Sequence, residues 1–183
     1  MHLIKRSLKV LPLALVAASF MTPSSAMAAD PASASCTFTG LAGNLTPAVR
    51  PIPQTGGGGT FTFGGTALTC TLVHGATVAP NVAATINASG SYTNTICGTG
   101  VANGTATISF AANPTGVTTG NATFTINFTG GVGVLQISRF TDNAGHTGQG
   151  GGQVNIVPAQ GSCTSGGVTA FTVAGGFTVA GTH

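Results

Sequence analysis

Apolar and polar residues alternate along much of the chain after residue 35, and Gly, Pro and Asn interrupt the alternation at short intervals. The clearest run is 122–128, where Ala, Phe, Ile and Phe share one face of a strand and Thr, Thr and Asn share the other. A period of two is typical of a strand with one buried face. This part of the chain shows no convincing helical period, so the pattern predicts an all-β protein.

The alternating runs and their interruptions predict about eight to ten short antiparallel strands. Residues 41–59 include several prolines and end in a run of glycines, which predicts a Pro/Gly-rich loop. The pair Gly64-Gly65 shifts the phase of the alternation and predicts a bulge or a tight turn, and Gly130-Gly131 predicts a hairpin turn. A single antiparallel β-sandwich and a small β-barrel both satisfy this pattern.

The N-terminal segment has the pattern of an export signal. Lys5, Arg6 and Lys9 form a basic region, residues 10–20 form a short apolar region, and residues 26–28 are Ala-Met-Ala. This order predicts a signal peptide over residues 1–28, with cleavage after Ala28. We therefore expect a secreted or cell-surface protein whose mature chain, residues 29–183, is a single all-β domain without a membrane span.

Charge is scarce once the predicted signal peptide is set aside. The remaining ionic side chains are Asp30, Arg50, Arg139 and Asp142, whereas about a quarter of a typical globular domain is Asp, Glu, Lys or Arg. No basic patch exists to bind nucleic acid, and the two carboxylates are too few for acid–base catalysis of the usual kind or for most metal sites. We therefore predict no nucleic-acid partner, no catalytic residues, no metal, no cofactor and no enzymatic activity.

The four cysteines, Cys36, Cys70, Cys97 and Cys163, predict two disulfides in an exported protein. Three connectivities satisfy this count. We favour Cys36–Cys70 and Cys97–Cys163, because strands that follow one another in sequence are usually neighbours. Zinc binding is disfavoured, because closely spaced ligand pairs such as Cys-x-x-Cys do not occur here.

Residues 138–152 form the most distinctive stretch, because Arg139, Asp142 and His146 lie close together in a Gly-rich context. One interpretation is a ligand-binding loop on a rigid β scaffold, where function commonly resides. The other is a long Gly-rich hairpin loop with a local ion pair between Arg139 and Asp142, which contributes little stability when exposed.

The composition favours a structural or adhesive role at the cell surface or outside the cell. A nearly uncharged surface favours association with itself or with a surface, through apolar patches or through the backbone of edge strands. The alternative is a soluble extracellular binding module that holds an apolar small molecule in the mouth of the barrel or sandwich. An associating protein supports the first expectation, whereas a monomer with an apolar pocket supports the second.

Overall fold

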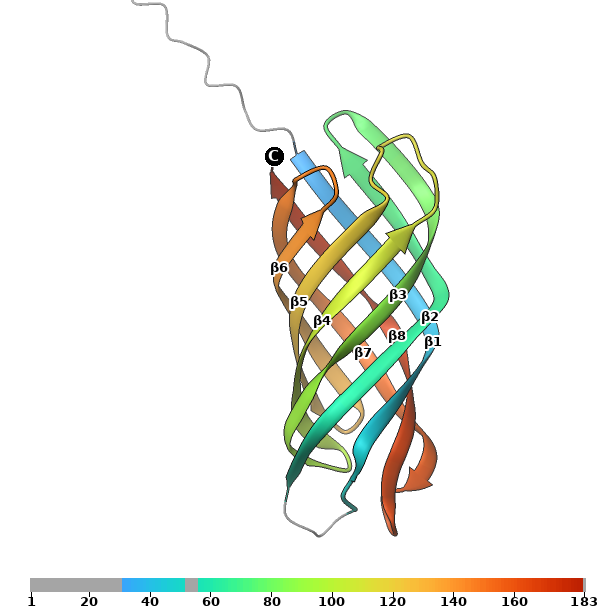
Figure 1. Cartoon of the computed structure of the whole chain (residues 1–183), viewed down its shortest axis with the longest axis vertical. Coiled ribbons are helices and arrows are strands. Elements are labelled where there is room, and N and C mark those ends of the chain that lie inside the picture. The colour runs from blue at the N-terminus through green and yellow to red at the C-terminus, as the bar shows by residue number, and fades with distance from the viewer. Residues whose placement is uncertain (1–30, 52–55, 183) are drawn as a thin grey trace, which may run out of the picture.

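The computed structural model describes residues 31–51 and 56–182, and the predicted signal peptide lies outside these ranges. Eight antiparallel strands form a closed barrel (Figure 1). The strands are β1 (Pro31–Val49), β2 (Gly57–His74), β3 (Thr77–Ile96), β4 (Thr99–Phe110), β5 (Thr119–Thr129), β6 (Val132–Asp142), β7 (Thr147–Ser162) and β8 (Gly167–Thr182).

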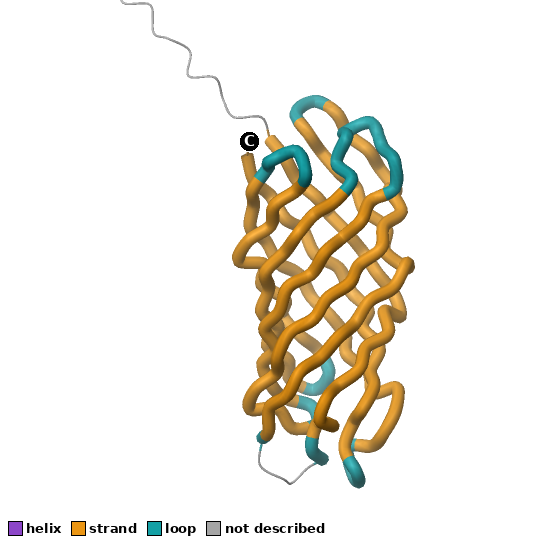
Figure 2. Tube along the Cα trace, viewed as in Figure 1, coloured by secondary structure: helices purple, strands orange, loops and turns teal. Residues whose placement is uncertain are grey.

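Each strand pairs with its neighbours in sequence, and β8 pairs with β1 to close the ring. Figure 2 shows that strands make up nearly all of the wall and that short loops join them at the two ends. The all-β, antiparallel prediction is confirmed, and the architecture is the barrel rather than the sandwich. A closed barrel leaves no unpaired edge. The described strands therefore offer no unpaired edge for association, and self-association itself stays a prediction.

Two details of the strand prediction are also wrong. The strands are long, from 11 residues in β5 to 20 in β3. The loop predicted at 41–59 is shorter than expected, because residues 41–49 complete β1 and residues 57–59 begin β2. Pro47 is tolerated in β1 because the β1–β8 register is irregular between Asn44 and Val49, where a missing N–H breaks no regular ladder.

Glycines determine where the chain bends and turns. The predicted phase shift at Gly64-Gly65 is a bulge within β2, since the β2–β3 register shifts between Gly65 and Leu68. The predicted hairpin at Gly130-Gly131 joins β5 to β6, and both glycines have positive φ. Positive φ is accessible to glycine without a steric cost.

The alternation places apolar side chains inside the barrel and hydroxyl and amide side chains outside it. Ile108 and Phe124 are buried, whereas their strand neighbours Thr107 and Thr123 are exposed. Inside, large rings lie over glycines of adjacent strands; a Cβ added to Gly43 would approach the Phe171 ring to 2.3 Å. This alternation of small and large residues fits the taper of a small barrel.

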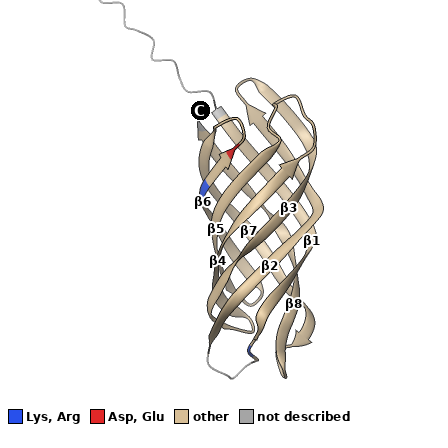
Figure 3. Cartoon of the chain, viewed as in Figure 1, with Lys and Arg blue, Asp and Glu red and all other residues tan. Residues whose placement is uncertain are grey.

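The outer wall is polar but nearly uncharged (Figure 3). Hydroxyl and amide groups bond across strands: Thr107 Oγ1 donates to Asn121 Oδ1 at 3.1 Å, and Thr125 Oγ1 donates to Asn103 Oδ1 at 2.7 Å. The large apolar side chains that the described wall exposes are valines: Val78, Val132, Val134 and Val157. No helix among the described residues is long and apolar enough to cross a membrane.

Candidate functional site

A cavity of about 310 Å³ occupies one end of the barrel. Gly98, Gly130 and Cys163, from the turns that follow β3, β5 and β7, lie on its rim. Chain reversals in an up-and-down barrel alternate between the two ends, so these turns share one end, where β1 also finishes. Side chains from every strand except β6 contribute to the lining.

The cavity has an aromatic floor. Phe63 lies 6.0 Å from Phe61, 6.2 Å from Phe124 and 6.4 Å from Phe171, measured between ring centroids. Beyond this cluster the barrel is filled by side chains, and the remaining space there is only about 30 Å³. The cavity is therefore a cup that opens at one end rather than a channel through the barrel.

Small residues and turns leave room above this floor. Ala102 of β4 is buried and faces the cavity, and the turns at Gly98 and Gly130-Gly131 add no side chains to the rim. Deeper in the barrel the small inward residues Ala106 and Ala122 lie among phenylalanine rings, which fill the space beside them. The cavity therefore exists because the inward position at Ala102 is small and the adjoining turns carry glycines.

The polar groups of the lining are already bonded to the protein. The Tyr92 hydroxyl donates a hydrogen bond to the Pro47 carbonyl, and Thr95 Oγ1 donates to the Thr93 carbonyl at 2.9 Å. Both side chains are buried, and the described lining residues include no Asp, Glu, Lys or Arg. The wall therefore offers carbon atoms and aromatic rings to a ligand.

Burial raises the pKa of the Tyr92 phenol above its ordinary value near 10. The neutral phenol is then favoured in the folded protein, so this stabilising contribution is present below about pH 10 and is lost as the pH rises through the folded-state pKa. Tyr92 is the only Tyr and Trp is absent, so phenolate absorbance reports this residue alone. We expect phenolate to appear only above pH 10 in the folded chain, and at lower pH in denaturant; ionisation at the same pH in both would contradict burial.

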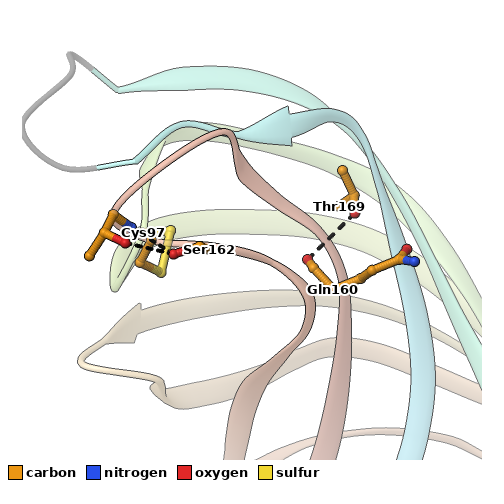
Figure 4. The surroundings of a disulfide bond; sticks show 6 residues. Cys97, Gln160, Ser162 and Thr169 are labelled. Atoms are coloured by element: carbon orange, nitrogen blue, oxygen red, sulfur yellow. Dashed lines mark hydrogen bonds between the residues drawn. A yellow bond between two sulfur atoms is a disulfide. The ribbon is translucent and has the colours of Figure 1, made fainter.

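The disulfide Cys97–Cys163 lies at the cavity end of the barrel. Figure 4 shows its surroundings. The disulfide joins the β3–β4 turn to the β7–β8 turn, which lie four strands apart in the ring of eight, and both cysteines contact the cavity. The Cys97 N–H also donates to the Arg50 carbonyl at 3.0 Å. This bridge therefore fixes the two sides of the mouth relative to each other.

The second disulfide joins Cys36 of β1 to Cys70 of β2, which lie directly opposite each other in the register. Both cysteines are fully buried inside the barrel. The connectivity that the sequence favours is the one in the structure. Two disulfides are compatible with an oxidising extracellular environment, while export itself stays a prediction.

The sequence-predicted ligand residues Arg139, Asp142 and His146 lie at the opposite end of the barrel. Arg139 is exposed on β6, and Asp142 ends that strand. The predicted long Gly-rich loop is instead a short turn at residues 143–146, because the glycines that follow belong to β7. The Gly-rich segment can pair as a strand since glycine lets the neighbouring backbones approach closely.

Within this turn the carboxylate contacts the histidine rather than the arginine. Asp142 Oδ2 lies 2.6 Å from His146 Nδ1, and Oδ1 accepts hydrogen bonds from the backbone N–H of Ala144 and of His146, each at 2.9 Å. Both side chains are buried, and the His74 ring lies 4.3 Å from that of His146. Asp142 therefore organises the turn, and a ligand role for Arg139, Asp142 and His146 stays a prediction.

Replacing Asp142 by Ala should destabilise the fold by roughly 3 kcal/mol, because several buried donors lose their acceptor at once. Denaturant unfolding of Asp142→Ala measures this cost. The matched control is Arg139→Ala on the same hairpin, where an exposed side chain is removed and the change should stay within about 0.5 kcal/mol. Equal stabilities for the two variants would show that the Asp142 contacts do not hold the turn.

Comparison with protein-family models, with curated proteins and with solved structures found no match to this chain. The residues of the candidate site are therefore identified from the structure of the barrel and not from a relative. The ligand residues that the sequence predicts do not include the cavity residues Tyr92, Phe61 and Ala102. The alternating pattern carries no signal for the space that small inward residues leave.

Proposed function

We propose that the barrel binds one small apolar molecule in the cavity at the end that carries the Cys97–Cys163 disulfide. The observation that carries this proposal is an apolar, largely buried cup of about 310 Å³ inside a barrel whose outer wall is polar. An interior of eight strands is just wide enough to be filled by side chains or to hold one small ligand. Ligand pockets in proteins are commonly apolar and of about 300–1,000 Å³.

The volume limits the size of the ligand. An engineered apolar cavity of about 150 Å³ binds benzene, which has six carbon atoms. On that scale the cup, at about 310 Å³, has room for roughly a dozen non-hydrogen atoms. A ten-carbon chain or a two-ring hydrocarbon is of this size.

This proposal takes precedence over the structural or adhesive role expected from composition. That role relied on edge strands or on apolar patches, and the described strands close into a ring without an edge. The exposed valines remain as apolar groups through which the chain can associate. Binding and surface attachment are compatible, but only the binding role uses the cavity.

Tyrosine emission offers a direct test, because Tyr92 is the only Tyr, Trp is absent, and Tyr92 lines the cavity. Decanol titrated into the purified chain should change this emission and saturate at one molecule per chain. Calorimetry under the same conditions provides a second readout that does not depend on fluorescence. The absence of a saturable signal in both measurements, up to the solubility of decanol, would overturn the proposal.

A further inference from the structure

One cation lies at the mouth of the cavity. Arg50 follows directly after β1, its carbonyl accepts from the Cys97 N–H, and its backbone forms a bridge with Ile96. Ile96 and Cys97 both line the cavity. The arginine is therefore attached to the rim itself, and its side chain is exposed.

The Arg50 side chain lies against the inner side of the barrel wall. Gly57 of β2 pairs directly with Thr95 of β3, which is buried and lines the cavity, so both residues face the interior. A Cβ added to Gly57 would lie 3.6 Å from Arg50 Nε and 3.8 Å from its Cδ. The guanidinium is thus placed where a molecule leaving the cavity would meet it.

The charge of Arg50 is not balanced at this end of the barrel. Asp142 is the only acidic residue that the structure describes, and it is the last residue of β6, at the opposite end, in contact with His146. The described part of the chain has one other arginine, Arg139, on the outside of β6. An apolar cup with a single unbalanced cation on its rim is complementary to a molecule with an apolar body and one negative charge.

We propose that the ligand is a single-chain carboxylate, whose hydrocarbon chain fills the cup and whose head group pairs with Arg50 at the rim. This inference rests on the proposed function. A guanidinium presents parallel N–H donors that match the two oxygens of a carboxylate, which makes a carboxylate a better partner than a neutral alcohol. The cavity accepts about ten to twelve non-hydrogen atoms on the benzene scale, so decanoate and decanol are matched probes with and without the charge.

The test compares the two probes on three proteins: the unaltered chain, Arg50→Gln and Arg139→Gln. The unaltered chain should bind decanoate about fivefold more tightly than decanol, as expected for one ion pair at a solvated rim. Arg50→Gln should remove this preference while leaving the decanol Kd unchanged. Arg139→Gln, which removes the same charge at the other end, should keep the preference, and added salt should weaken it.

The outcomes separate this inference from the proposed function. Equal binding of decanoate and decanol would overturn the carboxylate ligand and leave the apolar cup in place. An equal loss of both probes in Arg50→Gln, with unchanged melting temperature, would show that Arg50 shapes the rim and does not pair with the head group. If Arg139→Gln loses the preference for decanoate as fully as Arg50→Gln does, the preference reflects net charge alone. That result would also overturn pairing of the carboxylate with Arg50. Failure of both probes to bind the unaltered chain would refute the proposed function itself.

Discussion

Replacing Ala102 by Phe is expected to weaken the binding of decanol by about 100-fold or more. Ala102 is buried and faces the cavity, so the new ring occupies space that a ligand would use. A benzene-sized group needs about 150 Å³, which is near half of the 310 Å³ available. A ligand that leaves half of a ten-carbon chain in water loses roughly 4 kcal/mol, at about 0.8 kcal/mol for each CH₂ group.

The matched control is Thr105→Phe, which adds the same ring to the exposed face of the same strand. This variant should bind decanol as the unaltered chain does. Ala102→Val provides an intermediate step and should lose less affinity than Ala102→Phe. Because the ring enters existing space, Ala102→Phe should melt within a few degrees of the unaltered chain. Unchanged binding in a folded Ala102→Phe variant would show that the ligand lies outside the cup.

Removing the Cys97–Cys163 disulfide by the double substitution Cys97→Ala and Cys163→Ala is expected to lower both stability and ligand affinity. The two cysteines are 66 residues apart, and closing a loop of this length stabilises the fold by about 4 kcal/mol on the chain-entropy account. The bridge also forms part of the cavity rim. Without it, the turns after β3 and β7 are free to separate, so the mouth should open and water should reach the ligand.

The other disulfide is the control for this prediction. Cys36 and Cys70 are 34 residues apart and lie inside the barrel away from the cavity lining. Cys36→Ala with Cys70→Ala should lower stability by a similar amount, about 4 kcal/mol, and leave the decanol Kd of the folded fraction near its original value. Denaturant unfolding gives the stabilities, and titration at low temperature gives the affinities. Equal effects of both double variants on the Kd would contradict a rim role for Cys97–Cys163.

Much of the local structure could be predicted from the sequence, because each prediction depends on neighbours in the chain. The alternation at 122–128 predicts β5 and its buried face, and these residues do alternate between interior and exterior. Gly130-Gly131 predicts the hairpin because only glycine readily adopts positive φ at both positions. Of the three connectivities that four cysteines allow, the one favoured from strand order is the one observed.

The remaining features depend on contacts between distant residues. Closure of β8 on β1 distinguishes a barrel from a sandwich, and a period of two is the same in both. Residues 41–49 look like a loop in isolation, yet β8 and β2 pair with them on either side. The Gly-rich stretch after His146 likewise becomes a strand because β6 and β8 flank it.

The candidate site was the least predictable part. Asp142 and His146 stood out as rare ionisable groups, but they form a local turn at the end away from the cavity. The cup depends on the combination of inward positions that are small, such as Ala102, and on how far the surrounding strands extend. Such space is a property of the assembled barrel and has no local signature in the chain.

The central claim, that the cup holds the ligand, is tested most directly by heteronuclear NMR of the isotope-labelled chain during a decanol titration. We expect saturable shifts concentrated on cavity residues such as Tyr92, Ala102 and Ile126. Phe110 and Val117, which lie at the other end with Asp142 and His146, should change little. Shifts centred on that end or on the exposed Val78 and Val134 of the outer wall, with the cavity residues unmoved, would contradict the claim.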